Sequence, residues 1–263
     1  MPTLKIISNP NHLPASATIL VPVDLNQHQA FGQVCTDYSI EGMKQIEQRL
    51  KKGNGHHVTL FQGDEDPRSI ILWNCQAKTQ AACNELSIKM TKANADHLYG
   101  NVVVDCRMVE QSSYERDNLS ALLRAVFLAD HQVGKYKSEN NNNDKQIDTV
   151  YVLSTKNDEK IKSLFRRAQD AAETMKSCMN LVNEPANYKN PQFMAEWMVN
   201  SGKKYGFDVN ILDKPELEEL GFHALLAVNR GSEDPACCIV AEYSKGDKNT
   251  PTIALVGKGV TFD

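Results

Sequence analysis

The stretch Ile147-Asp148-Thr149-Val150-Tyr151-Val152-Leu153, with the segment from Asp158 to about Leu181 that follows it, indicates the class of fold. The first segment is rich in β-branched residues, which is typical of a strand. In the second, apolar residues recur at steps of three and four, which predicts an amphipathic helix, and Asn157 can cap its start. A strand followed by a long helix is typical of an α/β protein. The apolar positions of the predicted helix are Ile161, Leu164, Phe165, Ala168, Ala172, Met175 and Met179.

Strand and helix signals also alternate in the residues before this stretch, so we predict an N-terminal α/β domain over residues 1–155. A polar run from Lys137 to Lys145, with four consecutive Asn, cannot bury a core and is predicted as a surface loop inside this domain. The predicted strands are 18–23, 58–61, 68–73 and 101–105, and the predicted helices are near 79–97 and 115–132.

Residues 156–263 are predicted to hold the long helix and the first part of a second α/β domain. Periodicity alone leaves open whether this helix joins the two domains or belongs to the core of one of them. Further helices are predicted near 192–205 and 215–220, and strands at 208–212, 224–228, 237–242 and 252–256.

Composition excludes several classes of protein. The chain has 263 residues and a formal net charge of −4, so no basic excess favours a general nucleic-acid binder. No apolar run approaches the ~20 residues that span a bilayer, and the N-terminus does not resemble a signal peptide. The seven Cys include no Cys-x-x-Cys pair, which favours reduced, mostly buried thiols in a cytoplasmic protein over a disulfide framework or a Cys-based zinc site.

The end of the chain carries the clearest candidate for chemistry. Thr252–Val256 is a continuous apolar run of the kind found in a buried parallel strand, and Gly257-Lys258-Gly259 follows it. Binding sites in open α/β sheets form beyond the carboxyl ends of strands. Lys258 and Asp263 would point to opposite faces of one continuous strand, and they can converge only if the chain turns, which Gly259 permits. By itself, a Gly-Lys-Gly turn is more often a solvated loop, and Lys258 does not belong to a phosphate-binding P-loop.

Three segments together resemble the leucyl aminopeptidase family. Val256–Asp263, Val-Gly-Lys-Gly-Val-Thr-Phe-Asp, looks like the family's signature. Leu181–Pro191 resembles the segment that opens the family's catalytic domain, and Ala227–Pro235 resembles its Arg-Gly-Ser stretch. The specific resemblance covers roughly residues 165–263, whereas the first 155 residues resemble the family only in their α/β pattern.

The resemblance implies a fold and an activity. The fold would be an N-terminal α/β domain joined by a long helix to the beginning of an α/β metallopeptidase domain with a mixed central sheet. Family members are cytoplasmic hexamers that remove N-terminal amino acids from peptides with two divalent metal ions, usually Zn²⁺ or Mn²⁺. Matched by position, the Lys258 amine would bind one ion and Asp263 would bridge both. A Lys amine binds metal only when it is deprotonated, so its pKa of ~10.4 would have to fall.

The sequence departs from the family pattern where it stops, at Asp263. The family's catalytic Lys and Arg, two further Asp ligands and a Glu ligand come later, so no catalytic residue is expected within this chain. We therefore expect a fragment that is inactive alone and binds Zn²⁺ or Mn²⁺ weakly. The seven histidines form no His-Glu-x-x-His motif and are not expected to replace the missing ligands. They are His12, His28, His56, His57, His97, His131 and His223.

Two alternatives to an enzyme remain open. The N-terminal domain could be a non-catalytic module that recognises a nucleotide-like ligand or a nucleic acid. It lacks a Gly-rich phosphate loop, however, since Gly53-Asn54-Gly55 is the nearest match and looks like a hairpin turn. The chain could also act in the assembly of an oligomer, since members of the family form hexamers. Within the second part, Arg230–Pro235 is most simply interpreted as a turn.

Overall fold

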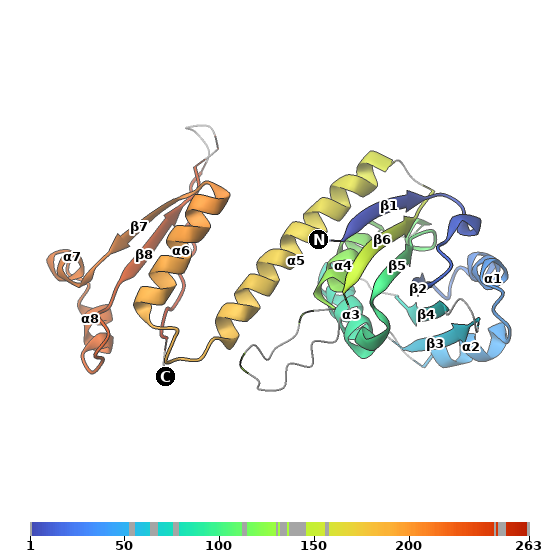
Figure 1. Cartoon of the computed structure of the whole chain (residues 1–263), viewed down its shortest axis with the longest axis horizontal. Coiled ribbons are helices and arrows are strands. Elements are labelled where there is room, and N and C mark those ends of the chain that lie inside the picture. Colours follow the sequence, from blue (N-terminus) through green and yellow to red (C-terminus); the bar gives the residue numbers. More distant parts are fainter. Residues whose placement is uncertain are drawn as a thin grey trace. The chain divides into compact units, whose positions relative to one another are not determined.

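The protein is described by a computed structural model, in which the chain divides into two compact units, Met1–Cys178 and Met179–Asp263 (Figure 1). The predicted loop Lys137–Lys145 and the proposed cap Asn157 lie outside the residues that the structure describes. The described residues are 2–52, 56–63, 68–75, 79–111, 115–129, 131, 136, 146–155, 158–244, 246 and 251–261.

The first unit contains a six-stranded sheet in the order β1-β6-β5-β2-β4-β3. Each of its neighbouring strand pairs is parallel except β3 and β4, which are antiparallel, so the sheet is mixed. This confirms the predicted α/β class and the four strands predicted before residue 106; the sequence analysis did not identify β1. A mixed sheet was also predicted, but for the metallopeptidase domain, whereas this one lies in the first unit. The strands are β1 (Thr3–Ile7), β2 (Ala17–Val23), β3 (His57–Gln62), β4 (Arg68–Asn74), β5 (Gly100–Asp105) and β6 (Ile147–Leu153).

Helices cover both faces of this sheet (Figure 1). Because side chains alternate along a strand, Leu20 and Val104 lie in the core formed with α3, α4 and α5, while Ile19 and Val103 lie in the core formed with α1 and α2. The helices are α1 (His28–Asp37), α2 (Met43–Leu50), α3 (Gln80–Ala93), α4 (Glu115–Leu128) and α5 (Asp158–Asn183), with short 3-10 turns η1 (Pro10–His12), η2 (Ala95–His97) and η3 (Val109–Gln111). The sequence analysis predicted α3 and α4 but missed α1 and α2.

The predicted long helix is confirmed as α5. Its apolar side chains from Ile161 to Ala172 are buried in the core of the first unit, and Phe165 meets Phe127 edge to face with ring centroids 5.0 Å apart. The first half of α5 is therefore a core helix of this unit, whereas Met175 is exposed. The domain boundary predicted after residue 155 precedes this helix and remains a prediction.

The second unit contains α6, packed against a two-stranded antiparallel sheet of β7 and β8 (Figure 1). Asn190 caps α6 by accepting a hydrogen bond from the Phe193 N–H at 2.9 Å, and Gly206 ends the helix with a φ of 73°. Asp213 and Glu216 form a capping box at the start of α7. The elements are α6 (Pro191–Tyr205), β7 (Asp208–Leu212), α7 (Lys214–Glu219), α8 (His223–Asn229) and β8 (Cys238–Glu242).

Two strand predictions in this unit are wrong. Residues 224–228 lie in helix α8; a short apolar run has no periodicity that separates a strand from a helix. Residues 252–256 form neither a helix nor a strand, and the side chains of Ile253, Leu255 and Val256 are 84%, 95% and 98% exposed. A strand needs a neighbour for its backbone groups, and no described segment pairs with this one.

Candidate functional site

Lys258, the first of the two predicted metal ligands, lies in the extended segment 251–261 and is exposed to solvent. Open space surrounds its two neighbours, since a methyl group added to Gly257 or Gly259 would meet no atom within 4 Å. Asp263 lies outside the described residues. The convergence of Lys258 with Asp263 therefore remains a prediction.

The two other segments that carry the resemblance meet in the second unit. The Asn190 side chain donates a hydrogen bond to Asp234 Oδ1 at 3.4 Å, and the thiol of Cys237 lies 3.7 Å from the carbonyl oxygen of Pro191. Asn229 fixes the turn that follows it, because its Nδ2 donates to the Asp234 carbonyl at 2.8 Å and its Oδ1 accepts from the Ala236 N–H at 3.1 Å. The predicted turn at residues 230–235 is confirmed, and hydrogen bonding explains its Asn and Asp residues.

No metal site is complete within the described residues. No three His, Cys, Asp or Glu side chains there lie close enough together to hold an ion. His28 lies 3.5 Å from Glu47, and the ring of His97 packs edge to face on Phe61, so both histidines have ordinary contacts. All seven cysteines are free, but three of them are buried, three are intermediate and one is exposed, so the prediction that most are buried is wrong. An ion held by the predicted pair would need further ligands.

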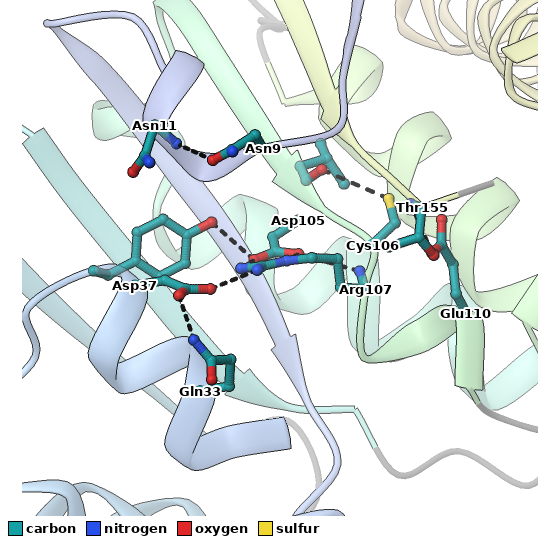
Figure 2. Close-up of polar contacts among 11 residues, drawn as sticks. Asn9, Asn11, Gln33, Asp37, Asp105, Cys106, Arg107, Glu110 and Thr155 are labelled. Atoms are coloured by element: carbon teal, nitrogen blue, oxygen red, sulfur yellow. Dashed lines mark hydrogen bonds and ion pairs between the residues drawn. The ribbon is translucent and has the colours of Figure 1, made fainter. Parts of the chain in front are cut away.

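A buried charge network that the sequence analysis missed lies at the carboxyl end of β5 (Figure 2). The Arg107 guanidinium donates from Nη1 to Asp37 at 2.5 Å, and from Nη2 and Nε to Asp105 at 2.7 and 3.0 Å. The Tyr38 hydroxyl donates to Asp105 Oδ2 at 2.8 Å. We call these four residues the Arg107 network. Asp105 follows an apolar run directly, which was the available signal; its partner Asp37 is 68 residues away in sequence, so only the fold shows the pairing.

The environment of the Arg107 network shifts two pKa values. Burial raises the pKa of Tyr38, and the charge of Asp105 raises it further. Burial opposes the charge of Arg107, but its hydrogen bonds and charge contact with Asp105 outweigh burial and raise the pKa of Arg107. Both groups therefore stay protonated at neutral pH, and their hydrogen bonds link α1 to the end of β5.

Glu110 is a second buried carboxylate at this edge of the sheet (Figure 2). It accepts hydrogen bonds from the Ser154 hydroxyl, from the Thr155 N–H at 3.1 Å and from the Thr155 hydroxyl at 2.7 Å. Its own N–H donates to the Cys106 carbonyl at 2.8 Å. These bonds join η3 to the end of β6, and they give Glu110 a structural role.

Comparison with known proteins supports one family. Residues 176–263 match the catalytic domain of the cytosol aminopeptidase family. A probable cytosol aminopeptidase from Bacillus subtilis is 37% identical over 147 residues, which are 56% of this chain and 29% of that protein. One from Rickettsia rickettsii is 32% identical over 187 residues, 66% of this chain and 37% of that protein. The chain thus spans about a third of the length of the curated relatives it matches.

Solved structures agree in fold. A mutant of tomato leucine aminopeptidase superposes with a TM-score of 0.71 at 17% identity, over 91% of this chain and 50% of that one. The bottromycin maturation enzyme BotP, solved in complex with Mn, gives a TM-score of 0.60 at 16% identity, over 89% of this chain and 46% of that one. The family model and the curated relatives support the resemblance to leucyl aminopeptidases that the three sequence segments predicted, and the solved structures show the same fold. No described helix is both long and apolar enough to cross a membrane.

Proposed function

We propose that this chain is part of a metal-dependent aminopeptidase, an enzyme that releases N-terminal amino acids from peptides. One observation carries the proposal: residues 176–263 match the family's catalytic domain, and that range contains Lys258 and Asp263. The names of the curated relatives, cytosol aminopeptidases, support peptide substrates and a cytoplasmic location. Assembly into a hexamer is part of the same proposal.

The two predicted ligands fit divalent ions by their chemistry. A carboxylate such as Asp263 can bridge two ions with its two oxygens, and the Lys258 amine can bind Zn²⁺ or Mn²⁺ once it has lost its proton. Two bound ions would polarise the scissile carbonyl and lower the pKa of a shared water towards ~7. The BotP structure, which contains Mn, supports a metal.

Residues 1–263 alone are proposed to be inactive. One amine and one carboxylate do not complete the ligand sets of two ions, and the described residues offer no other cluster of ligands. The purified 263-residue protein is therefore expected to show no hydrolysis of leucine-p-nitroanilide above the blank with Zn²⁺ or Mn²⁺ added. Measurable turnover that is abolished by Lys258→Ala would contradict this proposal.

Metal binding tests the ligand assignment separately from activity. Calorimetric titration of the same protein with Zn²⁺ and Mn²⁺ is expected to show weak binding that is lost in Lys258→Ala and in Asp263→Ala. Lys203→Ala, which removes an exposed lysine of α6, is the matched control and should bind as the unmodified protein does. Equal affinity in all four proteins would show that Lys258 and Asp263 are not ligands.

A further inference from the structure

A cavity of about 290 Å³ lies in the first unit, and none of the residues that line it is a proposed metal ligand. Its wall is built from segments distant in sequence: η1, the strand β2, the end of α1, and the facing ends of β3 and β4. The volume is close to the lower end of the ~300–1,000 Å³ that ligand pockets occupy, which favours a small ligand. Polar side chains provide much of the lining, which favours a ligand that forms hydrogen bonds.

One wall of the cavity carries a surplus of negative charge. Asp37 lines it and belongs to the Arg107 network, which contains two carboxylates and one guanidinium. Gln33 donates to Asp37 Oδ1 at 2.7 Å and Arg107 donates to Oδ2, so the carboxylate is fixed in place. Each oxygen keeps a second lone pair. A cationic group in the cavity would bind these lone pairs and neutralise the surplus charge.

Another wall carries a positive charge. Arg68, the first residue of β4, donates from Nε to the Ala15 carbonyl at 2.9 Å and from Nη2 to the Pro14 carbonyl at 3.2 Å. These bonds fix the guanidinium but leave its charge without a carboxylate partner among the described residues. Its Nη1 keeps donors for a carboxylate ligand.

Ser39, also in the lining, has a backbone conformation that glycine would adopt with less strain. Its φ is 52°, and the Ile40 N–H donates to the Cys35 carbonyl at 2.7 Å, which is the bond of a Schellman motif at the end of α1. Gln62 holds this turn by donating to the Tyr38 carbonyl at 2.9 Å. Strained residues that persist are concentrated at functional sites. Here the strained residue is one of those that line the cavity.

We propose that this cavity binds a small zwitterion, a free amino acid or a dipeptide, with its ammonium group at Asp37 and its carboxylate at Arg68. Opposite charges fixed on two walls of one small cavity recognise a molecule that carries both charges. The Ser39 hydroxyl provides a further hydrogen bond, and Leu13, which lines the cavity and is half-buried, contacts an apolar side chain. Neither Lys258 nor Asp263 belongs to this site.

Calorimetry of the 263-residue protein in EDTA tests the proposal without any contribution from bound metal. L-leucine and L-leucyl-L-leucine distinguish the two kinds of zwitterion, and saturable binding is expected for at least one of them. N-acetyl-L-leucine lacks the ammonium group and L-leucinamide lacks the carboxylate. Each should bind at least about tenfold more weakly than L-leucine, if L-leucine is the zwitterion bound, because a charge-assisted bond is lost. No saturable heat for either zwitterion at up to ~10 mM would overturn the proposal.

Variants of the lining residues show which side chain binds which group of the ligand. Arg68→Gln should weaken L-leucine about tenfold but leave L-leucinamide unchanged, because the amide has no carboxylate for Arg68 to bind. Ser39→Gly should weaken binding while the protein stays folded, since glycine suits the conformation of residue 39. Arg166→Gln, which removes an exposed arginine of α5, is the control and should bind normally. If Arg68→Gln weakens L-leucine and L-leucinamide equally, or neither, the assignment of the carboxylate to Arg68 is wrong.

Discussion

Arg107 shows how much a single side chain can contribute to this fold. Its guanidinium lies between Asp37 and Asp105, and the Asp105 side chain is 1% exposed. A buried carboxylate that loses its counter-charge keeps the cost of its lost hydration. The stability of the structure at the carboxyl end of β5 therefore depends on Arg107.

We expect Arg107→Ala to lower the free energy of unfolding by about 3 kcal/mol, because it leaves Asp105 buried and unpaired. Urea denaturation followed by circular dichroism measures the change. Arg166→Ala removes an exposed arginine and should change stability by no more than about 0.5 kcal/mol. Equal effects of the two substitutions would show that the Arg107 network contributes little.

Thiol reactivity provides a second prediction at the residue scale. Burial raises the pKa of Cys75 to about 12, with a smaller contribution from the charge of Asp24. At pH 8 about one in ten thousand Cys75 thiols is then ionised, and only the thiolate reacts with iodoacetamide. Cys178 is exposed on α5. Mass spectrometry after brief labelling at pH 8 should find Cys178 modified well before Cys75, and Cys75 labelling should rise as the pH increases towards 12. Faster labelling of Cys75 at pH 8 would contradict its burial.

At the scale of the elements, Gly202 allows α6 to pack close to β7. A methyl group added to Gly202 would lie 2.7 Å from the Phe207 carbonyl oxygen and 2.7 Å from Cγ2 of Val209. One of these atoms belongs to the backbone, so a larger residue cannot be accommodated by a side-chain rotation. The position of α6 against the sheet thus requires glycine here.

Gly202→Ala is therefore expected to destabilise the second unit by about 1–3 kcal/mol, despite the higher helix propensity of alanine. Fluorescence of Trp197, in α6, can follow unfolding of this unit in urea. Gly231→Ala is the control, because open space surrounds that residue and its φ is not positive. A lower urea midpoint for Gly231→Ala than for Gly202→Ala would contradict the predicted clash.

The whole molecule contains two units with very different cores. Every residue of β2 in the first unit is buried. The buried apolar side chains in the described part of the second unit are those of Ala195, Leu217 and Ala236. A two-stranded sheet with so small a core is marginally stable. Local stability is therefore expected to differ between the units.

Hydrogen exchange measures this difference. Backbone amides of β7 and β8 should exchange at least about 100-fold faster than those of β2, because opening the second unit exposes little apolar surface. The edge strand β3 of the first unit is the internal control for exposure, since it also has a free edge. Equal protection of β2 and β8 would show that the second unit is more stable than its buried residues indicate.

The sequence by itself determined the α/β class, the long helix α5, most strands of the first unit, and the resemblance of three segments to the leucyl aminopeptidase family. These features depend on local periodicity and on short motifs, both of which are read along the chain. The Lys258 and Asp263 pair was also found in this way, and its role as a metal site stays a prediction.

Only the tertiary structure decided which residues meet across long sequence separations. The Arg107 network and the cavity between Asp37 and Arg68 join side chains from different elements, and no local pattern predicts such contacts. Residues 224–228 and 252–256 show the same limit. An apolar run becomes a strand only when a neighbouring strand satisfies its backbone hydrogen bonds, and that neighbour is set by the fold.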